Sequence, residues 1–460
     1  MEIALLLAIS LPLLLLFTLR NHYVRKSSRR PPGPRALPLI GNMHQFDSLN
    51  THVYLYKLSQ KYGPLMSLQL GSVQTLVISS AAAAKQVFKY HDLCFSSRPT
   101  LVGSQRVSYN GIDVVFAPYN EYWRDMRKLC NLHLFSSKRS QSFQPIREQE
   151  VARMVKTICA AAADSNVVNL SKILKTLTSS IIFKITFGRG YHDEDDYFPL
   201  VGRLIYRLSG ACERLEKSFI ALDSFYQQLI DEHLHASSVS GQECSILDIL
   251  LKMKKDSSEF TIDHVKAILM NVIIGASDTS AAAVVWAMTL LIRNPAKMKK
   301  AQKEVREVTG EKGFVAENDV QKLVYLKAVV KEAMRLNPPI PLLIPRQTIE
   351  KCMINGYDIE AKTLVYVNAY AIGKDPECWE NPNEFLPERF MMSSIDFKGQ
   401  DFELIPFGVG RRICPGMAMG VATTELALAN LLYPFNWELP PGEDRKDIDM
   451  AALPASSGLI

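Results

Sequence analysis

A ten-residue stretch near the C-terminus, Phe407 to Gly416, constrains the fold more than any other part of this 460-residue chain. Three glycines within it let the backbone turn tightly and approach a flat ligand closely. Cys414 stands near its end, followed by Pro-Gly and an apolar helical run from Met417 to Leu432. A thiolate just before a helix start is stabilised by the exposed N–H groups and by the positive end of the helix. The stretch therefore predicts a loop that holds a ligand beside a helix N-terminus.

The side chains around this cysteine narrow the ligand further. Arg411 and Arg412 lie just before Cys414 and can hold carboxylates. A soft thiolate, a tight loop and paired cations together suit an iron porphyrin that carries propionates. An isolated cysteine is more often a small buried core residue. Here the surrounding spacing favours the ligand role.

The stretch resembles the cytochrome P450 signature, Phe-x-x-Gly-x-Arg-x-Cys-x-Gly, which it matches at Phe407, Gly410, Arg412, Cys414 and Gly416. The resemblance implies that Cys414 is the axial ligand of haem b, iron protoporphyrin IX, and that Gly408 also belongs to the cofactor loop. In such enzymes the thiolate pushes electron density onto the iron and favours O–O cleavage.

Composition and charge exclude several other classes of protein. The chain is 47% hydrophobic and 22% charged, which is ample for a large core. Its eight cysteines form no CxxC pair, so neither a disulfide framework nor a zinc site is predicted, and reduced thiols in a cytosolic compartment fit better. Beyond residue 35 the chain has 47 basic and 46 acidic residues. That balance gives no reason to expect nucleic-acid binding.

An apolar run from Ile3 to Leu19 is just long enough to span a bilayer as a helix. A cleaved signal peptide is the competing interpretation, but the basic residues follow the run and no Ala-x-Ala-like site appears. The basic excess places the body on the cytosolic side. The Pro-Pro-Gly-Pro joint that follows resembles the hinge of P450s in the endoplasmic-reticulum membrane, and we expect a single-pass protein there. The predicted parts are an anchor at 1–19, a basic and proline-rich linker at 20–35 and a P450 catalytic domain at 36–460.

Further residues suit the propionates of a haem. Trp123 and Arg127 are four apart on a predicted helix and share one face. Taken alone they would be a surface cation–π pair. They match the family's Trp-x-x-x-Arg, which implies that both reach the propionates, together with Arg346 and Arg412.

A long helix is predicted over 261–293, ending at Asn294-Pro295. A second membrane span is the rival interpretation, but Asp278 at its centre would cost about 2.5–3.5 kcal/mol in a bilayer. Thr279 alone would be a helix residue that bonds back to a carbonyl. The segment resembles the family's Ala/Gly-Gly-x-Asp/Glu-Thr, which implies that Asp278 and Thr279 deliver protons to bound dioxygen beside a local helix distortion. Ala276 replaces the usual glycine.

Other segments agree with the resemblance. Glu332 and Arg335 could be a weak surface pair, but with Arg389 downstream they match the family's buried triad. The irregular stretch 91–118 is predicted to be a long functional loop over the substrate pocket. The remaining predicted elements are helices at 50–62, 80–90, 140–162 and 167–187 and strands at 65–70 and 75–78.

Two departures from the family pattern were found. The acidic loop that ends at Asp196 runs directly into Tyr197-Phe198-Pro199, so a roof helix near 195–197 is predicted to be missing. The C-terminal hairpin expected beyond Leu453 is also predicted to be missing, because the chain ends at Ile460. Without these elements water should enter the pocket and uncouple electron use from product formation.

The predicted fold is mainly α with small β-sheets, with haem between the long helix and the cysteine loop. The chain resembles a plant A-type P450 monooxygenase. It would insert one oxygen atom from O2 into a small apolar plant secondary metabolite, with electrons from NADPH through NADPH–cytochrome P450 reductase. A basic face for that partner is predicted at Arg124, Lys128, Lys138, Arg139 and Arg411. Two alternatives stay open, an O2-independent haem-thiolate isomerase or dehydratase and a non-functional or regulatory variant chain with an incomplete pocket.

Overall fold

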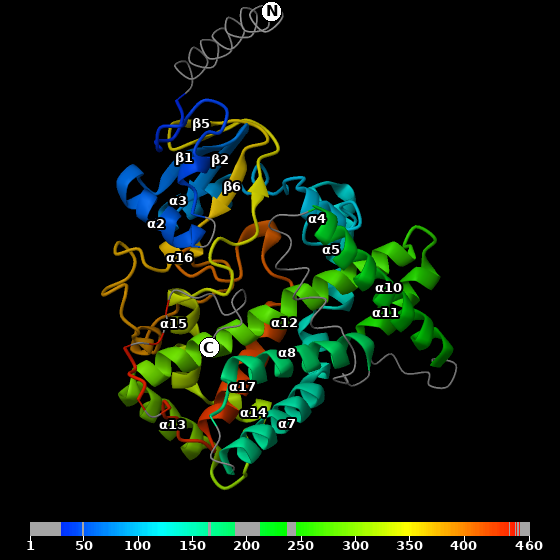
Figure 1. Ribbon diagram of the computed structural model, residues 1–460, viewed down its shortest axis with the longest axis vertical. Coiled ribbons are helices and arrows are strands. Elements are labelled where there is room, and N and C mark those ends of the chain that lie inside the picture. The colour runs from blue at the N-terminus through cyan, green and yellow to red at the C-terminus, as the bar shows by residue number, and fades with distance from the viewer. Residues whose placement is uncertain are drawn as a thin grey trace, which may run out of the picture. The chain divides into compact units, whose positions relative to one another are not determined.

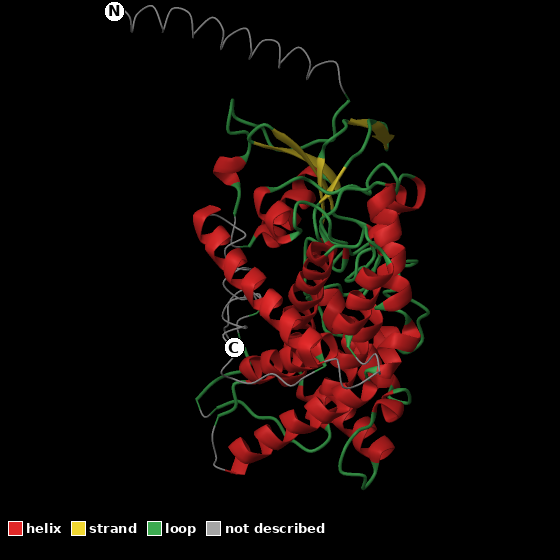
Figure 2. Cartoon of the chain, turned by 90° about the vertical axis from the view of Figure 1, so that its right-hand side faces the viewer, coloured by secondary structure: helices red, strands yellow, loops and turns green. Residues whose placement is uncertain are grey.

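The computed structural model describes residues 29–47, 50–163, 167–188, 212–236, 245–440, 442–446, 448 and 450. Helices make up most of the described chain and strands only a small part (Figure 2). The chain divides into two compact units. The strand-containing unit comprises Met1–Pro99, Pro341–Pro382 and Phe402–Arg412, and the helical unit comprises Thr100–Ile340, Asn383–Asp401 and Ile413–Ile460. The predicted membrane anchor, missing roof helix and missing C-terminal hairpin lie outside the described residues.

The strand-containing unit is built on a four-stranded sheet with the strand order β1-β2-β6-β3. Strands β1, β2 and β6 are labelled in Figure 1. Antiparallel β1 and β2 come from the N-terminal segment, and β6 joins β2 in parallel. Strands β4 and β5 form a separate antiparallel hairpin. The strands are β1 Leu65–Leu70, β2 Val73–Ile78, β3 Arg346–Gln347, β4 Cys352–Ile354, β5 Tyr357–Ile359 and β6 Leu364–Val367.

Short helices flank these strands. Ser80 begins α3 as predicted, because its hydroxyl accepts a hydrogen bond from the Ala83 N–H at 3.2 Å. The predicted 80–90 helix changes after Lys85 into a π-helix. The helices are η1 Met43–Gln45, α2 Thr51–Tyr62, α3 Ala81–Lys85, η2 Gln86–Tyr90, α16 Ala369–Ile372 and η4 Gly410–Arg412.

The helical unit is organised around α12, Ile262–Arg293, which packs against α8, α15, α17 and α11. It is the one helix among the described residues that is long and apolar enough to cross a membrane, but 72% of its most apolar window is buried within the protein. The predicted choice of a core helix over a second membrane span is therefore confirmed. Asn294 ends α12, and Pro295 begins α13 as its first residue.

The other helices of this unit are α4 Val102–Val107, α5 Glu121–His133, α6 Ser137–Ser142, α7 Gln144–Ala163, α8 Leu170–Phe187, α10 Cys212–Ala236, α11 Ile246–Asp256, α13 Pro295–Thr309, α14 Glu317–Val320, α15 Val324–Leu336, η3 Pro387–Phe390 and α17 Met417–Leu432. The prediction that 91–118 is irregular throughout was wrong, because α4 forms within it. The hydrophobic pattern of α4 is too short for sequence periodicity to indicate a helix.

The predicted buried triad is confirmed. The Glu332 carboxylate binds Arg335 through two hydrogen bonds of 2.7 and 2.8 Å and binds Arg389 Nε at 3.1 Å. It also accepts the Leu386 N–H at 2.8 Å. The side chains of Glu332 and Arg335 are fully buried. The triad thus ties α15 to the segment around η3.

Glu425 on α17 gives the fold a pH dependence. The side chain is buried, and desolvation raises its pKa to about 7 although Lys327 and Lys331 lower it. Since this native pKa lies above the ordinary value, the stabilising contribution of the protonated form is full in acid and is lost as pH rises through 7. We expect a loss of about 2–3 kcal/mol between pH 5 and 8, and a much smaller loss in Glu425→Gln. Urea unfolding midpoints at both pH values measure it, and parallel profiles for the two proteins would contradict it.

Candidate active site

Cys414 lies directly before α17 in the helical unit and is half-buried. Burial raises the pKa of its thiol, while the Gly416 N–H and the Arg127 guanidinium lower it. A Cβ added at Gly416 would meet no atom within 4 Å, so the backbone two residues after the cysteine is open on that side. The cysteine is thus placed to become a metal-bound thiolate next to a helix N-terminus.

Arg127 and Trp123 lie on α5, whose first turn is capped by Asn120, the acceptor of the Trp123 N–H at 2.8 Å. Arg127 Nη2 donates to the carbonyl of Ile413, the residue before the cysteine. The indole Nε1 of Trp123 donates to the Val114 carbonyl at 2.9 Å. The structure therefore brings Arg127 to the cysteine loop, whereas the indole N–H of Trp123 is directed to the 112–117 segment. Their role toward propionates stays a prediction.

The middle of α12 has an open face. Gly275 is exposed and Thr279 half-buried in a helix that is otherwise mostly buried. The Thr279 hydroxyl donates to the Gly275 carbonyl at 2.7 Å, which is the helix bond that sequence alone would favour. A Cβ at Gly275 would meet nothing within 4 Å outside its own helix. The helix runs through this point without a break, although a local distortion was predicted.

Asp278 is turned away from that open face. Its carboxylate is buried and pairs with Lys175 Nζ of α8 at 3.3 Å. One turn further along α8, the Thr178 hydroxyl donates to the Ser277 carbonyl at 2.7 Å. Sequence reasoning missed both α8 residues, because no motif marks them.

A second buried carboxylate, Asp113, fixes the segment after α4 to α12. It accepts Asn271 Nδ2 at 2.8 Å and the N–H groups of Phe116 and Ala117, both at 2.8 Å. Desolvation raises its pKa to about 6 despite these donors. Asn271 in turn accepts the Val114 N–H at 3.1 Å. The segment next to Trp123 is therefore held by a side-chain network on α12.

In the strand-containing unit, Asp92 organises the loop that precedes Cys414. Its carboxylate accepts the Arg411 N–H and Arg411 Nη1, both at 3.0 Å, and Arg346 Nη1 at 3.3 Å. Gly410 has a φ of +66°, and a Cβ there would lie 2.4 Å from Asp92 Oδ1. Glycine at 410 is therefore required both by its backbone conformation and by the carboxylate packed against it.

The predicted cations of this unit are also anchored. Arg346 is buried, donates to the Val409 carbonyl at 2.5 Å and lies 4.4 Å from the Phe88 ring centre. Desolvation lowers its pKa to about 10. Arg412 Nε donates to the Ser96 carbonyl at 2.8 Å. Backbone carbonyls and Asp92 thus fix both cations in place.

We expect Gly410→Ala to damage the cofactor loop far more than Gly408→Ala. Both glycines have positive φ, so alanine is strained at either one, at a cost of order 1–2 kcal/mol. Only at 410 does the new methyl clash with the Asp92 carboxylate, whereas at 408 the nearest atom is 3.8 Å away. Haem retained per folded chain measures the effect. Equal retention in the two variants would contradict it.

Comparison with known proteins identifies the family. A sequence model of the cytochrome P450 family matches residues 31–459. A 5-OH-xanthotoxin synthase of Pastinaca sativa is 47% identical, with 97% of this chain and 94% of that protein covered. Cytochrome P450 71A9 of Glycine max is 48% identical, with coverages of 95% and 94%. Strychnine-11-hydroxylase of Strychnos nux-vomica is 47% identical, with coverages of 92% and 88%.

The fold gives the same result. A solved structure of a zebra fish cytochrome P450 with abiraterone superposes with a TM-score of 0.74 at 26% identity, covering 84% of this chain and 91% of that chain. The chain belongs to the cytochrome P450 family. It is therefore a P450 monooxygenase, and the predicted fold, mainly α with small sheets, is confirmed.

The family implies a haem iron cofactor, and the residues of this P450 fit one. The helical unit supplies a half-buried cysteine, a cation bound to the preceding residue and an open face at Gly275 and Thr279 on α12. The predicted site residues fall in both units. The helical unit carries Trp123, Arg127, Asp278, Thr279 and Cys414, and the strand-containing unit carries Arg346, Phe407, Gly408, Gly410 and Arg412.

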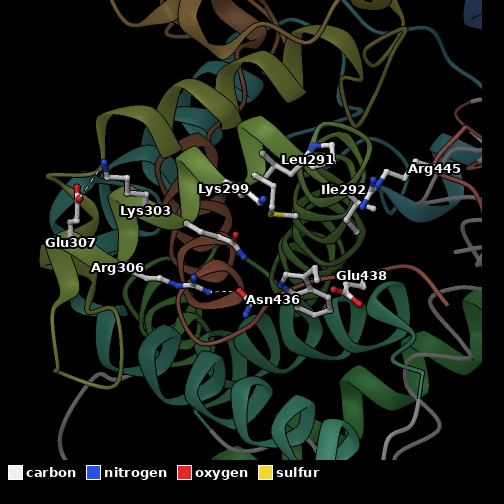
Figure 3. A pocket seen from close by; sticks show the side chains of 13 residues that line it. Leu291, Ile292, Lys299, Lys303, Arg306, Glu307, Asn436, Glu438 and Arg445 are labelled. Carbon is white, nitrogen blue, oxygen red and sulfur yellow. Dashed lines mark hydrogen bonds and ion pairs between the residues drawn. The ribbon is translucent and has the colours of Figure 1, made fainter. Parts of the chain in front are cut away.

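A separate pocket of roughly 900 Å³ lies among the end of α12, α13, residues 436–438 and Arg445 (Figure 3). Two of its cations have partners among the lining residues: Arg306 donates to Asn436 Oδ1 at 2.9 Å, and Lys303 lies 3.8 Å from Glu307. None of the predicted cofactor or proton-transfer residues lines it. It plays no part in the site described above.

Proposed function

We propose that this P450 holds haem b through Cys414 and inserts one oxygen atom from O2 into a small apolar plant secondary metabolite. The observation that carries the proposal is the half-buried Cys414 just before α17, next to the Gly416 N–H and to Arg127, which donates to the Ile413 carbonyl. Haem with a thiolate ligand supplies O2 activation. The similarity to plant synthases and hydroxylases named for secondary metabolites supports the substrate class.

The chain's own residues would divide the work as follows. Arg127, Trp123, Arg346 and Arg412 would hold the propionates, with Trp123 exchanging its bond to Val114. Thr279 lies on the open face of α12 and can pass a proton from its hydroxyl when it releases the Gly275 carbonyl. Asp278 would relay protons from the Lys175 side, because its carboxylate pairs with that partly exposed lysine. Phe407, Gly408 and Gly410 would shape the loop around the ligand.

We further propose that electrons come from NADPH through NADPH–cytochrome P450 reductase. An acidic flavodomain would find exposed Arg124 and Lys128 on α5 and Lys138 on α6. Residues 1–19 would anchor the chain in the endoplasmic-reticulum membrane, with the catalytic domain in the cytosol. Fractionation with protease protection tests the anchor, and recovery of the full-length chain in the soluble fraction would refute it.

The deciding experiment is a carbon-monoxide difference spectrum of the purified protein, followed by turnover on a panel of apolar plant metabolites with reductase. A thiolate-type spectrum and a product that requires both NADPH and O2 support the proposal. Product formed without NADPH would show an isomerase or dehydratase. A protein that gives no thiolate-type spectrum would be a non-functional variant.

A further inference from the structure

Two cysteines outside the active site meet in the strand-containing unit. Cys94 lies in the turn after η2, and Cys352 begins β4. The Cys94 thiol donates to the Glu350 carbonyl at 3.3 Å, and its own carbonyl accepts the Ile349 N–H at 2.8 Å. Cys352 packs on the same hydrophobic cluster that contains Cys94. The two cysteines, far apart in the sequence, therefore lie on chain segments that these hydrogen bonds hold together.

The two sulfurs share a hydrogen bond. This bond lowers the pKa of Cys94 to about 7 and raises the pKa of Cys352. A thiol with a pKa near ambient pH combines a large thiolate fraction with good nucleophilicity. Other cysteines differ: burial raises the pKa of Cys130 to about 12 and that of Cys378 to about 11.

The two cysteines differ in how far they are exposed to solvent. Cys94 is buried, with 6% of its surface exposed, while Cys352 is half-buried. Solvent therefore has more access to Cys352 than to Cys94, so a small oxidant would approach the pair from the Cys352 side. Disulfides in cytosolic proteins are usually transient and redox-sensing rather than structural.

We propose that Cys94 and Cys352 form a redox-active dithiol site that hydrogen peroxide converts to a disulfide and a small thiol reductant restores. The Cys94 thiolate attacks one peroxide oxygen, the O–O bond breaks, and the released hydroxide takes a proton to become water. The sulfenic acid left on Cys94 is attacked by Cys352, so the S–S bond forms, the S–O bond breaks and a second water leaves. The two thiols lose two electrons and the peroxide gains them.

The site lies beside the cofactor loop of its own unit. Cys94 is two residues from Asp92, which binds Arg346 and Arg411, and two residues from Ser96, which accepts Arg412 Nε. The disulfide would therefore add a covalent link to the segment that positions this loop.

The test uses the full-length haem protein, treated with graded hydrogen peroxide, alkylated and analysed as unreduced peptides by mass spectrometry. We expect one intramolecular cross-link between the peptides of Cys94 and Cys352, lighter by two hydrogens and removed by dithiothreitol. Alkylation of Cys352 after peroxide should fall at least tenfold. Cys94→Ser and Cys352→Ser should each abolish the cross-link, while Cys159→Ser and Cys378→Ser, at exposed cysteines, should keep it.

The carbon-monoxide spectrum of each serine variant confirms that it is folded, so loss of the cross-link can be assigned to loss of the sulfur. Two results would overturn the proposal. One is an unchanged alkylation rate at Cys94 and Cys352 after peroxide. The other is thiol loss explained by links between molecules through the exposed cysteines.

Discussion

Cys414→Ser is expected to abolish the thiolate-type carbon-monoxide spectrum and to reduce NADPH-dependent product to background. A serine hydroxyl stays protonated where a thiol ionises, so the variant cannot offer the same anionic sulfur donor. The replacement is nearly isosteric, and the hydrogen bonds that Arg411 donates to Asp92 and Arg127 donates to the Ile413 carbonyl do not involve the sulfur. The fold should therefore survive while the spectrum is lost.

Cys378→Ser is the matched control, because that cysteine is exposed and has no predicted ligand role. Haem content and circular dichroism are recorded for both variants, so that loss of ligation is distinguished from loss of folding. A thiolate-type spectrum in Cys414→Ser equal to that of the parent would remove Cys414 as the axial ligand.

Glu332→Ala is expected to cost about 3–5 kcal/mol of folding stability, because it leaves a buried guanidinium without its carboxylate. Arg335 is fully buried and makes both of its carboxylate hydrogen bonds to Glu332. Arg335 Nη2 also donates to the Glu384 carbonyl at 3.1 Å, but a neutral carbonyl cannot neutralise the charge. The midpoint of thermal loss of the carbon-monoxide spectrum measures the effect.

Glu307→Ala is a suitable comparison, since Glu307 also lies on a helix of the helical unit but pairs with Lys303 at the surface, where both side chains are mostly exposed. Such pairs are worth about 0.2–1 kcal/mol. If both substitutions lower the midpoint equally, the buried triad contributes no more than a surface pair.

Sequence motifs predicted the parts of this protein whose chemistry depends on residues near one another in the chain. The cysteine loop, the Trp-x-x-x-Arg helix and the Asp-Thr pair each fit within ten residues. The buried triad was also predicted, because Glu332 and Arg335 form one short motif and Arg389 lies in another. Helix 261–293 was predicted within one residue of its observed start, since a polar cap and a proline mark its ends.

Contacts between distant side chains could not be predicted in this way. Nothing near Asp92 marks it as the acceptor for Arg346 and Arg411, and nothing near Lys175 marks it as the partner of Asp278. The Cys94–Cys352 pair was missed because its members are 258 residues apart and no CxxC spacing exists. Such pairs arise from packing of whole elements, which a local pattern does not contain.

The Asp92 network also sets an order for biosynthesis. Its carboxylate and the Arg411 N–H are separated by 319 positions, and strand β2 pairs with β6, which also comes late in the chain at Leu364–Val367. At about 5–20 residues per second, the ribosome needs on the order of tens of seconds to deliver these partners. During that interval the edge of β2 that binds β6 and the Asp92 carboxylate do not yet have these partners. The cofactor loop can therefore be completed only after Arg411 has been synthesised, so haem loading must follow the synthesis of both partners.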